Sequence, residues 1–232
     1  MQPEKLLNRK SMVAIVSADI VRSTSLTTEA LIELRKKLFG FFDDLEGDYP
    51  GLWARIVRGD CIECFVPKYR YALRIVVLMK LFIKIQTNQY DCSELLQKHG
   101  IRFSIGVAEL EYVSKKEDII DGPAIYMSGR NLDYIHRKGD IYSIIEVDGI
   151  SREANCFLDS YVSMISYMLD SYSAKMAEVV FYKLLGFKER EISERLGIFQ
   201  SSVNTRSTNA QWGLLHTVIQ DFENLNFDRI CG

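Results

Sequence analysis

Near its N-terminus the chain has an apolar run that ends on a carboxylate, and this run limits the folds that are open to it. Residues 12–16 read Met-Val-Ala-Ile-Val, and Asp19 follows as the run gives out. A run of this kind is typical of a buried β-strand. A carboxylate at the end of a buried strand costs free energy unless a cation or hydrogen-bond donors satisfy it. Two interpretations follow: Asp19 caps the next turn, or it serves a metal ion or a phosphate.

Helical and strand-like patterns alternate over the first 150 residues. Apolar residues recur at helical spacing from Thr28 until Gly47, and further helices are predicted at 69–87 and 124–137. The other patterns read as strands, at 53–57, 61–66, 101–110 and 141–147. The order predicts an α+β fold of the ferredoxin-like kind, with one antiparallel sheet and helices on one face.

No strand pattern follows Ser151. The remaining segments all read as helices, at 157–169, 174–185, 190–196, 200–215 and 218–225. We therefore expect two domains: residues 1–150 form an α+β domain, and residues 151–232 form an all-α domain.

Composition excludes several classes of protein. The 29 basic and 31 acidic residues give a net charge of -2, so DNA binding needs a local basic patch. Residues 72–85 are the most hydrophobic segment, but Arg74, Lys80 and Lys84 interrupt them, so no membrane span is expected. Residues 1–10 are polar and do not resemble a signal peptide. Cys61 and Cys64 have a metal-like spacing without a second pair, which favours ordinary thiols in a cytoplasmic protein.

Two carboxylates form the first candidate site. Asp60 follows Gly59 in the predicted hairpin turn, and it can meet Asp19 if the two strands are sheet neighbours. Converging carboxylates suit Mg²⁺, which combines one or two of them with phosphate oxygens. A glycine turn can present backbone N–H groups to a phosphate without a Cβ. Gly59, together with Ser23 and Thr24 after the first strand, is therefore a candidate phosphate ligand.

Four blocks of residues resemble the class III nucleotidyl cyclase domain and, at least as closely, the SatD-like family of bacterial proteins. The blocks are residues 17–24, 59–60, 102–106 and 122–130, and the resemblance covers about residues 12–148. It implies a nucleotidyl-cyclase-like fold in which Asp19 and Asp60 hold two Mg²⁺ or Mn²⁺ ions. It also implies that Arg130 is the catalytic arginine, which stabilises charge on the transferring phosphate, and that the domain forms a homodimer.

The chain departs from the cyclase pattern at the nucleoside end of the site. The ribose-orienting asparagine of cyclases corresponds to Tyr126, and the base-reading lysine falls near Ala54 or Ile56. The acidic partner of that lysine corresponds to Ile119. The metal and phosphate end is thus retained, whereas the nucleoside end is not, which favours a degenerate, nucleotide-sensing domain over an active cyclase.

A second candidate site lies at residues 187–213. Ile192 and Leu196 give one helix an inner face, Gly197 suits a left-handed turn, and Val203 faces inward from a second helix. This helix-turn-helix pattern resembles sigma-factor region 4 over about residues 176–215. Residues 181–213 contain five basic and three acidic side chains. The candidate DNA contacts are polar residues of the second helix, namely Gln200, Ser201, Ser202, Asn204, Thr205, Arg206 and Asn209.

The leading hypothesis combines the two sites. It describes a DNA-binding transcriptional regulator with a degenerate, nucleotide-sensing cyclase-like domain, which binds two DNA half-sites as a homodimer. One alternative is an active metal-dependent cyclase with an accessory helical tail. A further alternative is a protein-interaction module, in which the aspartates only cap turns and the helices only pack.

Overall fold

The computed structural model describes residues 12–57, 59–138 and 143–227. Its main sheet has five strands in the order β2-β3-β1-β4-β7. These strands are β1 (Val13–Ile20), β2 (Trp53–Val57), β3 (Cys61–Val66), β4 (Ile101–Ala108) and β7 (Ile144–Val147). Every pairing is antiparallel except β4 with β7. Because β3 lies between β1 and β2, the sheet has the split βαβ arrangement of ferredoxin-like folds. The predicted α+β class is therefore confirmed.

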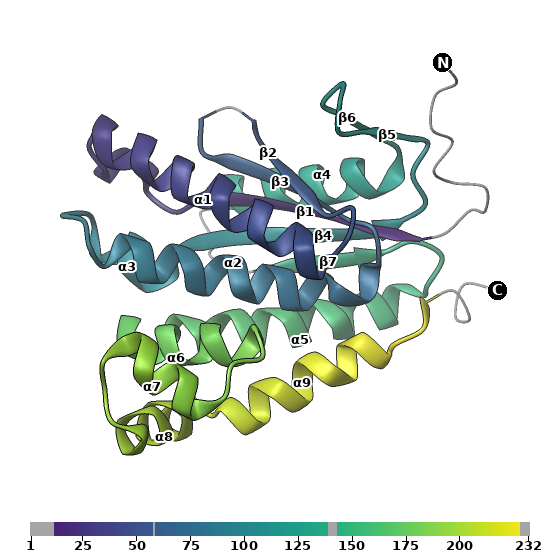
Figure 1. Cartoon of the computed structure of the whole chain (residues 1–232). Helices are drawn as coiled ribbons and strands as arrows, with labels where there is room; N and C mark the ends of the chain where they lie inside the picture. Colours follow the sequence, from purple (N-terminus) through teal and green to yellow (C-terminus); the bar gives the residue numbers. More distant parts are fainter. Residues whose placement is uncertain (1–11, 58, 139–142, 228–232) are drawn as a thin grey trace.

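Helices cover both faces of this sheet (Figure 1). The helices α1 (Thr28–Asp48) and α2 (Ala72–Thr87) share one core with alternate residues of β1, such as Ala14 and Val16. The intervening Val13 and Ile15 belong to a second core with α4 (Pro123–Lys138). The expectation that helices lie on one face only was therefore wrong. Period-two alternation indicates which residues share a face, but not that a helix covers the other face.

Gly106 of β4 explains how closely α4 approaches the sheet. A Cβ at this position would lie 2.2 Å from the carbonyl oxygen of Ala124 and 3.0 Å from the amide nitrogen of Ser128. Any side chain would therefore push α4 away from β4. On the neighbouring strand β1, the hydroxyl group of Ser17 hydrogen-bonds with that of Ser128 on α4, 2.9 Å apart. These contacts fix α4 over the end of β1.

Side chains of α5 (Arg152–Asp170) close the open edge of β7. The amide nitrogens of β7 residues Ile145 and Val147 donate to Asp159 and Asn155, both at 2.8 Å. Ser163 donates to the carbonyl oxygen of Ser143, also at 2.8 Å. The three α5 residues are four positions apart and so line one face of the helix. They satisfy backbone groups that an edge strand otherwise leaves unpaired.

The helical region begins with α5 at Arg152, before the helix predicted from residue 157, and it packs on the sheet. The further helices are α6 (Ala174–Leu184), α7 (Glu189–Leu196), α8 (Gln200–Asn209) and α9 (Trp212–Asn224). Val162 and Phe222 belong to the same core as Val16 of the sheet. Arg74 of α2 donates to Glu223 of α9 from Nε at 2.5 Å and from Nη2 at 3.2 Å. The division into two domains stays a prediction.

Several boundaries differ from the sequence prediction. The helix predicted at 200–215 is two helices, because Gln211 adopts a left-handed conformation with φ of 52°. The short helix α3 (Glu94–His99) and the hairpin β5 (Tyr112–Ser114) with β6 (Ile119–Asp121) were not predicted. The strand predicted at 141–147 is described only from residue 143, and its first two residues lie outside the described ranges.

Candidate functional site

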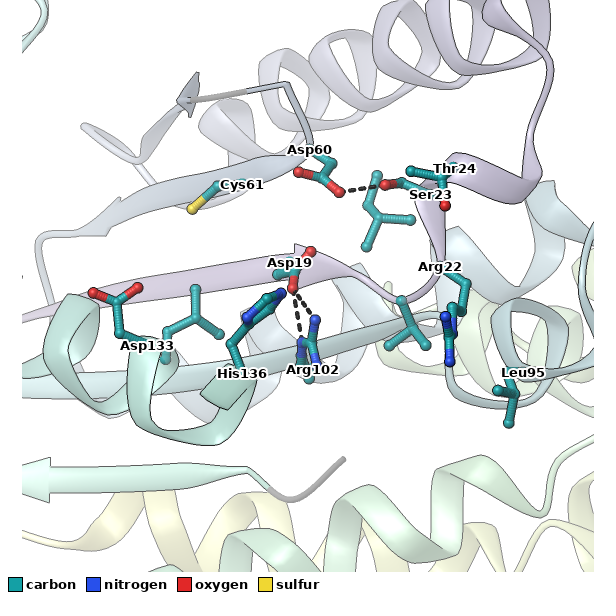
Figure 2. A pocket seen from close by; sticks show the side chains of 13 residues that line it. Asp19, Arg22, Ser23, Thr24, Asp60, Cys61, Leu95, Arg102, Asp133 and His136 are labelled. Carbon is teal, nitrogen blue, oxygen red and sulfur yellow. Dashed lines mark hydrogen bonds and ion pairs between the residues drawn. The ribbon is translucent and has the colours of Figure 1, made fainter. Parts of the chain in front are cut away.

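A pocket of about 620 Å³ lies at the end of β1 (Figure 2). Strands β1, β3 and β4, the short 3-10 helix η1 (Ser23–Ser25), α3 and α4 surround it. The chain brings most of the polar residues predicted for a first site to this pocket. Its lining is Asp19, Ile20, Val21, Arg22, Ser23, Thr24, Asp60, Cys61, Leu95, Arg102, Leu132, Asp133 and His136.

Asp19 forms an ion pair with an arginine that the sequence analysis did not single out as a site residue. Arg102 is its antiparallel cross-strand partner on β4. Arg102 donates to Asp19 Oδ2 from Nε at 2.7 Å and from Nη2 at 2.5 Å. Burial raises the pKa of Asp19, and the negative charge of Asp60 raises it further, whereas the Arg102 hydrogen bond and charge oppose the rise. Asp19 is thus a buried carboxylate with a built-in counterion.

Asp60 faces the same pocket but bonds to a different partner. The Ser23 hydroxyl donates to Asp60 Oδ2 (Figure 2). Gly59 adopts φ of +84°, a conformation that favours glycine. No atom lies within 4 Å of the position of a Cβ on Gly59. The structure therefore explains this glycine by its backbone conformation, and the predicted phosphate contact of Gly59 stays a prediction.

Arg130 does not line the pocket. Its side chain is 64% exposed, and its Nη2 lies 3.5 Å from Glu146 of β7. The α4 residues that line the pocket are Leu132, Asp133 and His136, and of these His136 lies beside Asp19 (Figure 2). Within one chain the structure therefore does not bring Arg130 together with Asp19 and Asp60. Tyr126, at the position of the ribose-orienting asparagine, donates from its hydroxyl to Asp121.

The residues of this pocket do not fit a two-metal centre. The Arg102 guanidinium already binds Asp19 Oδ2, and Ser23 already binds Asp60 Oδ2. Within the described residues, no three His, Cys, Asp or Glu side chains are grouped so that they could hold a metal ion. A divalent cation would have to compete with Arg102 for Asp19. The Mg²⁺ or Mn²⁺ cofactor stays a prediction.

The pairing of Asp19 with Arg102 had a signal in the sequence. The strand at 101–110 starts with Ile-Arg, and the first strand ends with Asp-Ile. Antiparallel pairing of these two ends places the two charges opposite each other. The topology was needed to show that the strands are neighbours. Arg22, Asp133 and His136 also line the pocket and were not predicted. They lie in a loop and a helix, where no strand pairing indicates which residues become their neighbours.

The predicted DNA-binding residues lie in a compact unit of three helices, α6, α7 and α8, which we call the α6–α8 unit. Val179, Ile192 and Val203 contribute one buried side chain from each helix. Gly197 joins α7 to α8 with φ of 62° and ψ of 36°, which confirms the predicted left-handed turn. Five of the candidate side chains on α8 are exposed, and they are Gln200, Ser201, Asn204, Thr205 and Asn209.

Charged groups of the α6–α8 unit are largely paired with one another. Arg206 is half-buried, and its Nη1 lies 3.6 Å from Glu178 of α6. Lys183 and Arg190 form further ion pairs within the region, at 2.7 and 3.1 Å. Three of the five basic residues counted between 181 and 213 therefore have an acidic partner close by. The exposed surface of α8 is polar but uncharged.

The cysteines behave as ordinary thiols. Cys61, Cys64, Cys92 and Cys156 are free. Burial raises the pKa of Cys61 to about 12, with smaller contributions from nearby carboxylates, so its thiol is protonated at neutral pH. Cys64 is fully buried.

The hydropathy of the helices in the described ranges is too low, or their length too short, for any of them to cross a bilayer.

Comparisons with known proteins add a weak similarity of fold. No family model matches the chain, and a search of curated proteins found no match. A search of solved structures found the crystal structure of the guanylyl cyclase Cya2, with 18% sequence identity and a TM-score of 0.36. The alignment covers 53% of this chain and 70% of that chain. Similarities to SatD-like proteins and to sigma-factor region 4 stay predictions from the sequence.

Proposed function

We propose that this chain is a DNA-binding regulator that uses the α6–α8 unit as a helix-turn-helix, with α8 as the recognition helix. The observation that carries the proposal is the exposed polar surface of α8 on a unit with its own buried cluster. A recognition helix must be held in place by the helices next to it, and its outward side chains must reach base edges in the major groove. A helix surface that only faces solvent is usually rich in Lys and Glu, and α8 contains neither residue.

Gln200 and Asn204 are the residues best suited to read bases. They are four positions apart and exposed, so they lie on one face of α8. Each side chain carries a donor and an acceptor, and can bind adenine through N6 and N7. Arg206, in contrast, can reach a phosphate only by leaving Glu178. One such unit makes few contacts, so the proposed DNA-bound form is a homodimer on half-sites about 34 Å apart.

Selection from a random pool of duplex DNA tests this proposal. The purified chain is expected to enrich a two-fold symmetric motif. Gln200→Ala and Asn204→Ala should each weaken binding to that motif by about five- to 150-fold, because each removes a bidentate base contact. Gln220→Ala, an exposed glutamine on α9, is the matched control and should bind normally. No enriched motif, or equal binding by all three variants, would refute the proposal.

For the pocket, we propose ligand sensing without cyclisation. The support is the Arg102 guanidinium on Asp19, which places a fixed positive charge on the carboxylate that a metal-dependent cyclase needs free. A nucleotide that binds the folded chain should raise its thermal midpoint by mass action. Sustained formation of a cyclic nucleotide from a nucleoside triphosphate with Mn²⁺ would instead establish the active cyclase. A chain that binds neither DNA nor nucleotide would be a protein-interaction module.

A further inference from the structure

Phe199 is the most exposed of the large hydrophobic side chains in the described part of the chain, at 83%. It lies in the turn between α7 and α8, directly before Gln200. Ile198, directly before it in the turn, packs against the buried cluster of the α6–α8 unit, and so does the other phenylalanine of this region, Phe187 before α7. Leaving a phenylalanine in water forgoes the free energy that its burial would supply. The fold of the free chain therefore does not account for this side chain.

The backbone of Phe199 is nevertheless held firmly. Its carbonyl oxygen accepts from the amide nitrogens of Ser202 at 2.9 Å and Val203 at 3.1 Å. Phe199 is thus the N-cap residue of α8, with φ of -71° and ψ of 150°. Ser, Thr, Asp and Asn are preferred at this position because their side chains accept a hydrogen bond from the helix. Phe199 gives no such bond. The position neither buries the ring nor uses it as a cap.

The surroundings of the ring indicate what it could contact. The outward residues that follow it, Gln200, Ser201 and Asn204, are polar and uncharged. The N-terminal residues of a recognition helix are the ones that face base edges in the major groove. In that groove the C5-methyl group of thymine is the apolar feature, and apolar side chains, including phenylalanine, contact it. An exposed ring beside Gln200 is suited to this role.

We infer that Phe199 is a specificity-determining residue that contacts the C5-methyl group of a thymine next to the base read by Gln200. This inference rests on the proposed DNA-binding function. It predicts a thymine at a fixed position in each half-site. Contact with the methyl group also shields the Phe199 ring from water, so the complex gains the free energy of burial that the free chain lacks.

Replacing thymine by deoxyuridine tests the inference, because this change removes only the methyl group. Each thymine of the selected half-site is replaced in turn, and binding is measured by fluorescence anisotropy with the full chain. One replacement is expected to weaken binding of the unmodified chain by about three- to tenfold. Phe199→Ser should bind the thymine and deoxyuridine duplexes equally. Serine can cap α8, and circular dichroism verifies that the helix content is retained.

The control is Phe157→Ser, which changes a 73% exposed phenylalanine of α5. This variant should discriminate thymine from deoxyuridine as the unmodified chain does. The inference fails if no single replacement weakens binding, or if Phe199→Ser still discriminates; in either case the selected motif still supports DNA binding. If selection yields no motif, the proposed function itself fails, and the exposed ring is then better explained by contact with a protein.

Discussion

Arg102 and Asp19 face each other across β1 and β4, and two guanidinium nitrogens of Arg102 bind a single carboxylate oxygen of Asp19. The carboxylate that the cyclase resemblance assigns to a metal ion is therefore already paired with a cation of the chain. Both side chains are mostly buried, at 14% and 12% exposure, so water screens the pair only weakly. This relationship determines how the pocket should respond to a divalent cation.

Replacing Arg102 by glutamine should increase the affinity of the pocket for Mn²⁺. Glutamine carries no positive charge, so Asp19 and Asp60 would face the pocket with less compensation. We expect Mn²⁺ to raise the thermal midpoint of Arg102→Gln more than that of the unmodified chain. Arg55→Gln, which breaks a pair with Glu63 away from the pocket lining, is the control and should behave like the unmodified chain. Equal Mn²⁺ shifts in all three proteins would contradict this explanation.

Gly106→Ala should destabilise the fold by about 1–3 kcal/mol, the usual effect of overpacking. The added Cβ would fall 2.2 Å from the carbonyl oxygen of Ala124, so α4 must shift from the sheet. Gly129→Ala is the matched control on α4, because no atom lies within 4 Å of its Cβ position. It should stabilise the chain by about 0.5–1 kcal/mol, since alanine favours helices. Urea denaturation measures both, and equal effects would show that the close approach is unimportant.

The sequence was sufficient for the five strands of the main sheet, for most of the helices and for one end of the pocket. The apolar run before Asp19 and the glycine turn before Asp60 are local signals, and the structure brings both residues to one pocket. Partner choice is not local. Arg102 pairs with Asp19 only because β4 lies beside β1, and that adjacency depends on the whole sheet. The exposed position of Arg130 likewise depends on how α4 is rotated over the sheet.

Helix ends in the C-terminal region likewise could not all be predicted from the local sequence. Trp212 and Leu215 continue the apolar periodicity of the preceding helix, and the residue in the left-handed conformation is Gln211, whereas the nearby Gly213 lies inside α9. The local sequence therefore did not place the break at Gln211. Burial of Val203 and Ile192 was predictable from their spacing. The pairing of Arg206 with Glu178 was not, because it joins α8 to a helix about 28 residues earlier in the chain.

Asp170→Asn should destabilise the chain by about 3–5 kcal/mol, because it leaves a buried ammonium without its counterion. Lys80 has 2% side-chain exposure, and its Nζ lies 2.8 Å from Asp170 Oδ1. Burial lowers the pKa of Lys80, and Asp170 opposes this effect. The Lys80 ammonium also donates to the carbonyl oxygens of His99 and Ile101, at 2.6 and 3.0 Å. The pair therefore joins α2 to the end of α5, and the two carbonyl contacts of Lys80 join both to the start of β4, the strand that carries Arg102.

A double-mutant cycle separates this ion pair from simple loss of packing. Lys80→Met combined with Asp170→Asn should cost less than the sum of the two single changes, because neither charge is then left alone. Chemical denaturation of the four proteins gives the coupling energy. A coupling near zero would mean that Lys80 and Asp170 stabilise the fold independently, and that the pair does not link α2 to α5.

Lys84 should make the chain more stable as the pH rises above 8. Its pKa is lowered from 10.5 to about 8, first by burial and then by the charge of Lys80. Its Nζ donates to the carbonyl oxygens of Lys98 and Asp170. Between these two pKa values the unfolded chain binds a proton that the folded chain has released, so the free energy of unfolding increases with pH.

This gain in the free energy of unfolding is absent below pH 8, where Lys84 is protonated in both the folded and the unfolded chain. Between pH 8 and 9.5 the free energy of unfolding increases by about 2 kcal/mol. Urea denaturation at these two pH values, with the unmodified chain and with Lys84→Met, measures it as a difference. Lys36→Met changes an exposed lysine of α1 and should retain the increase. The same change in stability with pH in the unmodified chain and Lys84→Met would show that Lys84 titrates as it does in the unfolded chain. If only Lys84→Met lacks the increase in the free energy of unfolding with pH, burial of the charged Lys84 side chain destabilises the fold at neutral pH. Its two hydrogen bonds then offset only part of this cost.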